Sequence, residues 1–129
     1  MGYSTANKLR PLNINFDIYS DSEDNEFKGE LLTLMKGSIL ELQMAANESV
    51  AIRNADIFRK AAHKAKSTLI LLDDHEFFKA VEDLKELLNQ SAENRFNEEV
   101  NPRKIDTVNE LCDRIVESLE KEAERYRSS

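Results

Sequence analysis

His63 is the side chain best suited to chemistry in this chain of 129 residues. It lies in a segment, residues 56–72, whose apolar side chains recur at helical spacing. With about 100° of rotation per residue, these side chains fall within an arc of roughly 100°. They are Phe58, Ala61, Ala62, Ala65, Leu69 and Leu72. His63 falls nearly opposite the centre of this arc, so the pattern predicts that its imidazole faces solvent instead of the core.

Basic side chains surround this histidine. Between residues 57 and 72 the chain has four basic residues and no Asp or Glu, although its net charge is −7. The basic residues are Arg59, Lys60, Lys64 and Lys66. Neutral imidazole is a nucleophile near physiological pH, and lysine and hydroxyl donors can neutralise the oxygens of a phosphoryl group. The segment therefore favours His63 as a phosphoryl acceptor; the alternative is a solvated basic helix face with an incidental histidine.

The elements that must position His63 are predicted to be helices. Three Gly and two Pro residues are too few for the frequent turns of a sheet protein. Helical spacing predicts helices over residues 23 to 46–50, 54–72, 74–90 and 102–126, with a polar connection over residues 91–100. We expect an all-α fold, an antiparallel four-helix bundle (residues 23–129) preceded by an N-terminal arm or short extra helix (residues 1–22).

Local signals mark the ends and the buried faces of these helices. Ser22 is the expected N-cap of the first helix, Asp74 is the expected N-cap of the third, and Asn101-Pro102 begins the last. The first helix is expected to bury Phe27, Leu31, Leu34, Met35, Leu42 and Ala45. The last helix is expected to bury Ile105, Val108, Cys112, Ile115, Leu119, Ala123 and Tyr126. Steps of three and four residues are typical of the seam between packed helices.

Net charge and hydropathy exclude several classes of function. A general nucleic-acid binder carries a basic excess, whereas this chain has a net charge of −7, so we expect no nucleic-acid partner. No stretch approaches the roughly 18 apolar residues of a membrane span, and the N-terminus lacks the pattern of a signal peptide. The single cysteine, Cys112, cannot form an internal disulfide. We expect a cytoplasmic monomer without membrane contact, in which Cys112 is a buried and inert thiol.

Neither histidine has the spacing of a metal ligand. Di-iron bundles use Glu-x-x-His motifs, but Lys60 stands three residues before His63 and Leu72 stands three residues before His75. Neither histidine has a second histidine three or four residues away. We therefore expect no metal site.

The segment around His63 resembles a known family. Ala62-His63-Lys64-Ala65-Lys66-Ser67-Thr68 is similar to the A-H-x-[LA]-K-[GS]-[ST] core of histidine-containing phosphotransfer (HPt) domains. The acidic and aromatic residues at positions 24–27 and the run at positions 58–61 agree with the same family. The resemblance extends over residues 16–126, although outside the histidine segment it depends on pattern more than on identical residues.

The resemblance implies a phosphorelay intermediate. His63 would accept a phosphoryl group from an aspartate of a receiver domain and pass it to another receiver. Lys66 matches the family lysine that neutralises the phosphate, and Ser67 stands where a small residue leaves room for the incoming aspartate. Lys64 would be an additional phosphate-binding cation, although it points about 100° away from His63 on a helix.

The resemblance also implies how partners would bind. Ile70 shares the outward face of His63, and we expect it to form a docking patch with part of the first helix and with Arg59 and Lys60. The partners would be response-regulator receiver domains or a hybrid histidine kinase. The chain would be a phosphocarrier and not an enzyme, without a cofactor of its own, because the receiver domain brings the Mg²⁺. The alternative is a non-catalytic helical adaptor that binds a signalling partner and has lost phosphotransfer.

Two positions depart from the family pattern. The family commonly has Gly ten residues after the histidine, where this chain has Asp73. It often has Gln or Glu 22 residues after the histidine, to hydrogen-bond the imidazole, where this chain has Lys85 with Glu82 and Glu86 nearby. We expect the join between the second and third helices to differ, and the group that orients the His63 ring stays open.

Overall fold

The computed structural model describes residue 14 and residues 24–52, 54–91 and 102–127. The regular elements within these ranges are all helices, which confirms the all-α prediction. They are α2 (Asn25–Ala51), α3 (Ala55–Lys64), α4 (Lys66–Leu72), α5 (His75–Ser91) and α7 (Pro102–Arg127). The predicted arm over residues 1–22 and the predicted connection over residues 91–100 lie outside the described residues, except for Ile14, which packs against the core, and Ser91.

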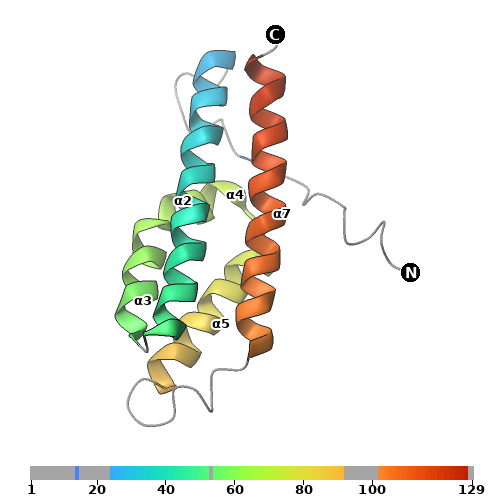
Figure 1. The fold of residues 1–129 in the computed structure, drawn as a ribbon. Coiled ribbons are helices and arrows are strands. Elements are labelled where there is room, and N and C mark those ends of the chain that lie inside the picture. The colour runs from blue at the N-terminus through green and yellow to red at the C-terminus, as the bar shows by residue number, and fades with distance from the viewer. Residues whose placement is uncertain (1–13, 15–23, 53, 92–101, 128–129) are drawn as a thin grey trace, which may run out of the picture.

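The four longer helices contact one another in a closed ring. α2 packs most extensively against α7 and also against α3, while α5 contacts both α7 and α3 (Figure 1). Each of these helices contributes fully buried side chains to one shared core. Among them are Leu32, Met35, Ile39 and Leu42 of α2, Phe58 of α3, Phe77, Val81, Leu84 and Leu88 of α5, and Val108, Cys112, Ile115 and Leu119 of α7. Burial of each such large side chain contributes about 1.5–3 kcal/mol, so this core is the main stabilising feature.

Polar side chains fix the alignment of α2 with α7. The side-chain amides of Asn47 and Asn109 bond reciprocally, at 2.9 Å from Asn47 Nδ2 and 3.0 Å from Asn109 Nδ2. Gln43 Nε2 donates to Asp113 Oδ1 at 2.9 Å and to Asn109 Oδ1 at 3.1 Å. Because amide and carboxylate groups bond only at short range and in defined geometry, these contacts hold one helix in register with the other.

The helix ends agree only in part with the expected caps. The prediction that Ser22 caps the first helix was wrong, because the N-cap is Asp24, whose Oδ1 accepts from the N–H groups of Glu26 (2.9 Å) and Phe27 (3.2 Å). An aspartate both caps the chain and favours the positive end of the helix dipole. The prediction for Asp74 is confirmed, since its Oδ1 accepts from the N–H of Phe77 at 3.1 Å.

The predicted continuous helix over residues 54–72 was wrong. It is interrupted at Ala65, with φ −83° and ψ 1°, so that α3 ends directly after His63 and Lys64. Neither Gly nor Pro occurs in this segment, and no side chain caps the start of α4. Ala65 is only 2% exposed. We attribute the break to the packing of α3 and α4 against the other helices, because local sequence preference does not favour it.

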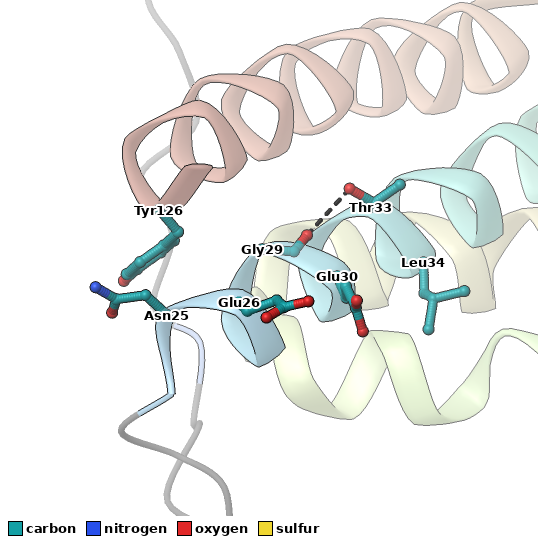
Figure 2. A pocket seen from close by; sticks show the side chains of 7 residues that line it. All are labelled: Asn25, Glu26, Gly29, Glu30, Thr33, Leu34 and Tyr126. Atoms are coloured by element: carbon teal, nitrogen blue, oxygen red, sulfur yellow. Dashed lines mark hydrogen bonds between the residues drawn. The ribbon is translucent and has the colours of Figure 1, made fainter. Parts of the chain in front are cut away.

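Leu34 also departs from the sequence pattern. It was expected in the buried set of α2, but it is 71% exposed. The fully buried apolar positions of α2 are Leu32, Met35, Ile39, Leu42 and Ala46. Leu34 instead lines a cavity between the beginning of α2 and the end of α7 (Figure 2). Periodicity shows that α2 has a stripe of apolar residues, but the packing of the neighbouring helices determines how wide the buried part of that stripe is.

Candidate functional site

His63 lies in the last turn of α3 with its side chain exposed, as the periodicity predicted. On the opposite face, Phe58 is fully buried and Ala62 is 6% exposed. Two hydrogen bonds fix where α3 begins. Asn54 caps the helix by accepting from the N–H of Asp56 at 3.0 Å, and Ser49 Oγ, at the end of α2, accepts from the N–H of Phe58 at 2.7 Å. The core and the caps therefore hold the imidazole on the outside.

A groove lies beside this imidazole, between α3 and α4 on one side and α5 on the other. Its volume is about 310 Å³, and it is called the His63 groove below. Three of the residues that line it are apolar: Ala62, Leu69 and Phe78. The other five residues are titratable: Arg59, His63, Lys66, Glu82 and Lys85. The groove thus combines a nucleophile, three cations and a single carboxylate.

The three cations of the groove have different partners. Arg59 forms an ion pair with Asp56 one turn earlier on α3. Lys85 forms an ion pair with Glu82 one turn earlier on α5, at 3.0 Å. Within the described residues, no carboxylate lies within ion-pairing distance of Lys66. Lys66 is therefore the cation of the groove that is most available to an incoming anion.

The structure places Lys60 and Lys64 on the other side of α3, away from the His63 groove. Both line a separate hollow between α2 and α3, together with Met44. Lys64 Nζ forms an ion pair with Glu41 of α2 at 3.0 Å. Of the cations expected to bind phosphate, the structure therefore brings Lys66 to the groove and not Lys64.

Ser67 and Ile70 are exposed on α4, and neither lines the groove. Ile70 is 61% exposed, as an outward position requires. Sequence reasoning missed Phe78, which is 45% exposed and lines the groove from α5. Its signal was available, since Phe78 directly follows the buried Phe77 and so falls outside the buried stripe of α5.

The two departures from the HPt pattern have clear structural positions. Asp73 has φ 49° and ψ 41° at the end of α4, and it is the one non-glycine residue with positive φ in the described part of the chain. This left-handed conformation is the one that glycine adopts most readily. Lys85, at the position of the family Gln or Glu, lines the same groove as His63.

Cys112 lies apart from this site, as expected of a buried and inert thiol. It is fully buried on α7. Burial, and to a lesser extent the charge of Asp113, raises the pKa of Cys112 to about 12. A thiol is reactive as the thiolate, which this environment disfavours. Among the described residues, no group of three or more His, Cys, Asp or Glu side chains is placed to hold a metal ion.

Another cavity, larger than the His63 groove, is not suited to the same chemistry. Its volume is about 740 Å³, and it lies between the first turns of α2 and Tyr126 at the end of α7 (Figure 2). Thr33 Oγ1 is occupied there by a hydrogen bond to the carbonyl of Gly29 at 3.0 Å. The charged side chains of its lining are Glu26 and Glu30, so it would repel a phosphoryl group.

No described helix is both long enough and apolar enough to cross a bilayer. Comparisons of the chain with protein-family models, with curated proteins and with solved structures find no match. The assignment of a function therefore depends on the residues of the His63 groove and on their geometry.

Proposed function

We propose that this chain is a histidine phosphotransfer domain that carries a phosphoryl group on His63. The observation that carries the proposal is that an exposed histidine and an available cation, Lys66, line the same groove, while the opposite face of the helix that bears the histidine is buried. A solvated basic face with an incidental histidine does not require a shared groove. The structure of His63 and its surroundings thus favours a site over an accidental charge pattern.

The architecture supports the same proposal. Under this proposal, α2, α3, α5 and α7 form an antiparallel four-helix bundle, which is the fold that the resemblance to HPt domains implies. The closed ring of contacts between these helices and their shared core agree with such a bundle. The long helices α2 and α7 would form the framework of this bundle, and α3 would carry His63 on the outer surface of the bundle.

Asp73 gives independent support to the resemblance. The family commonly has glycine at this position, ten residues after the histidine. A residue with φ 49° stands there in this chain. Since glycine is the usual residue at a left-handed helix end, the backbone at Asp73 has the conformation that explains the family glycine.

The proposed reaction is the reversible transfer of a phosphoryl group between His63 and an aspartate. The neutral imidazole attacks phosphorus through the ring nitrogen that has a free lone pair. The bond between phosphorus and the receiver carboxylate breaks, and the carboxylate takes the electron pair. The imidazolium formed at His63 then releases the proton of its other nitrogen to solvent. Lys66 neutralises charge on the phosphoryl oxygens, and the receiver supplies the Mg²⁺ and the rest of the catalytic groups.

The surface around His63 offers contacts for a receiver domain. Three large apolar side chains are exposed on different helices: Met44 on α2 (70%), Ile70 on α4 (61%) and Phe78 on α5 (45%). Positive charge is added by Arg59, which lines the His63 groove with Phe78, and by Lys60, which lines the hollow between α2 and α3 with Met44. Exposed apolar side chains with a polar rim are typical of protein interfaces. In this proposal the partners are response-regulator receivers, alone or as part of a hybrid histidine kinase.

The proposal is tested by phosphotransfer from a panel of phosphorylated receiver domains. We expect an acid-labile, base-stable label on the wild-type chain and none on His63→Gln, with the same free energy of unfolding for both because the side chain is exposed. His75→Gln is the matched control, since His75 is the other exposed histidine of the chain, and it should be labelled as wild type is.

Two outcomes would contradict phosphotransfer through His63. Label that persists on His63→Gln would place the phosphoryl group elsewhere. Absence of label from every receiver, with the chain folded, would favour the alternative of a helical adaptor. That alternative also predicts that binding of the partner survives His63→Gln.

A further inference from the structure

We propose that Lys85 of α5 is a second phosphate-binding cation, which exchanges the Glu82 carboxylate for the phosphoryl group when His63 is phosphorylated. The inference rests on the proposed function of His63. It assigns a role to Lys85, which stands where the HPt family often has Gln or Glu. It also makes the ion pairs of the groove depend on whether His63 is phosphorylated.

Lys85 lies in the same groove as His63. Lys85 and Glu82 line the His63 groove from α5, and His63 and Lys66 line it from α3 and α4. The Lys85 side chain is 33% exposed and the Glu82 side chain 43% exposed, so both are partly covered by the groove and both reach solvent. By contrast, Lys79 on the same helix is 78% exposed, pairs with Asp83 and does not line the groove.

Phosphorylation of His63 would change the balance of charge in the groove. Without phosphate, Asp56 balances Arg59 and Glu82 balances Lys85, which leaves Lys66 as the cation without a carboxylate partner among the described residues. A phosphoryl group brings close to two negative charges at neutral pH. Lys66 alone compensates one of them. The second charge would be close to Glu82, and this like-charge contact disfavours the phosphorylated state unless Lys85 changes partner.

Lys85 can leave Glu82 at little cost in stability. Partly exposed ion pairs within one helix contribute little to stability. The ammonium of Lys85 has three donors on a flexible stem, so it can turn from a carboxylate to a phosphoryl oxygen. Glu82, once released, is solvated because its side chain already reaches water. The exchange therefore requires the rotation of side chains and no movement of α5.

The experiment uses a small donor, so that no partner protein enters the measurement. Phosphoramidate phosphorylates histidine: its phosphorus–nitrogen bond breaks, ammonia leaves, and a new phosphorus–nitrogen bond forms at the imidazole of His63. The pKa of the attached phosphoryl group is then followed by ³¹P NMR titration. Nearby cations lower this pKa and nearby carboxylates raise it.

We expect opposite shifts from the two partners. Lys85→Met should raise the phosphoryl pKa, with about a threefold to fivefold increase in proton affinity, the size expected for one charge at a partly solvated site. Glu82→Gln should lower the pKa, because it removes a nearby carboxylate that competes with the phosphoryl group for Lys85. Lys66→Met should raise it, and Lys79→Met is the matched control that should leave it unchanged.

Failure of the inference and failure of the proposed function give different results. If wild type is labelled at His63 but Lys85→Met titrates as wild type and Lys79→Met do, Lys85 does not bind the phosphoryl group. If Glu82→Gln shifts the pKa in the same direction as Lys85→Met, the exchange is wrong. If His63→Gln is labelled as fully as wild type, the proposed function itself is contradicted, and the role of Lys85 with it.

Discussion

Two consecutive aspartates make the turn between α4 and α5, and each has a different task. Asp73 takes the left-handed conformation that ends α4, while Asp74 caps α5 through the N–H of Phe77. Left-handed backbone costs about 1–2 kcal/mol for most residues, less for Asn and Asp, whose short polar side chains bond locally. The pair therefore achieves with two carboxylates what a glycine and a cap achieve elsewhere.

This division of tasks predicts the effect of replacing Asp73. Asp73→Val should lower the free energy of unfolding by about 1–3 kcal/mol, because a β-branched residue is strained at positive φ. Asp73→Asn should stay within about 0.5 kcal/mol of wild type, since Asn tolerates the same conformation. Urea unfolding followed by circular dichroism measures both. Equal stability of the two variants would mean that the left-handed conformation is not required here.

The junction between α2 and α3 is held by a side chain of one helix that bonds the backbone of the next. Ser49 of α2 is fully buried, and its Oγ accepts from the N–H of Phe58 in α3 at 2.7 Å. The carbonyl of Ser49 accepts from the N–H of Asn54 at 3.0 Å. These two bonds set where α3 leaves α2, and therefore where His63 lies relative to the other helices.

Removal of the Ser49 hydroxyl should destabilise this junction. In Ser49→Ala the buried N–H of Phe58 loses its acceptor, which costs about 1–3 kcal/mol. The loss should appear as a lower midpoint of urea unfolding and as faster amide hydrogen exchange at the start of α3. Ser67→Ala, at an exposed position of α4, is the control and should remain within about 0.5 kcal/mol of wild type. A stability of Ser49→Ala equal to that of Ser67→Ala would show that solvent satisfies the Phe58 N–H.

Cys112 reports on the packing of the whole molecule, because it lies fully buried on α7 in the core that the helices share. Its pKa rises from an ordinary value of 9.0 to about 12, chiefly through burial. Above pH 9 the unfolded chain therefore releases the thiol proton, while the native chain keeps it. Because the native state then binds more protons, this group contributes stability below pH 9 that is lost as the pH rises toward 12.

The sign of this effect can be measured against a variant without the thiol. Cys112→Ala should be less stable than wild type at neutral pH, because it leaves a small cavity. Its disadvantage should shrink between about pH 9 and 11, since the wild type alone loses up to roughly 1.4 kcal/mol per pH unit from the thiol. Urea unfolding of both proteins across this range measures the difference. Parallel stability curves would contradict the raised pKa of Cys112.

The spacing of residues within single helices was enough to predict most of the buried and exposed faces of those helices. His63 points outward and Phe58, Ala62 and Leu69 point inward, as an arc on one helix requires. Most of the predicted seam of α7 is buried, and Asp74 caps α5 as its position suggested. These features depend on residues three or four apart, whose relative directions the geometry of one helix sets.

Contacts between helices decided the rest. Four features depend on parts of the chain that no local pattern connects. They are the break at Ala65, the exposure of Leu34, the hydrogen bond from the Phe58 N–H to Ser49, and the groove that Phe78 and Lys85 share with His63. Phe78, Glu82 and Lys85 follow His63 by 15 to 22 positions in the sequence. They line its groove because α5 packs against α3. The choice of His63 as the candidate residue and its exposure to solvent could therefore be predicted from the residue types and their spacing along one helix. The groove beside His63 exists only because α3, α4 and α5 pack on a common core.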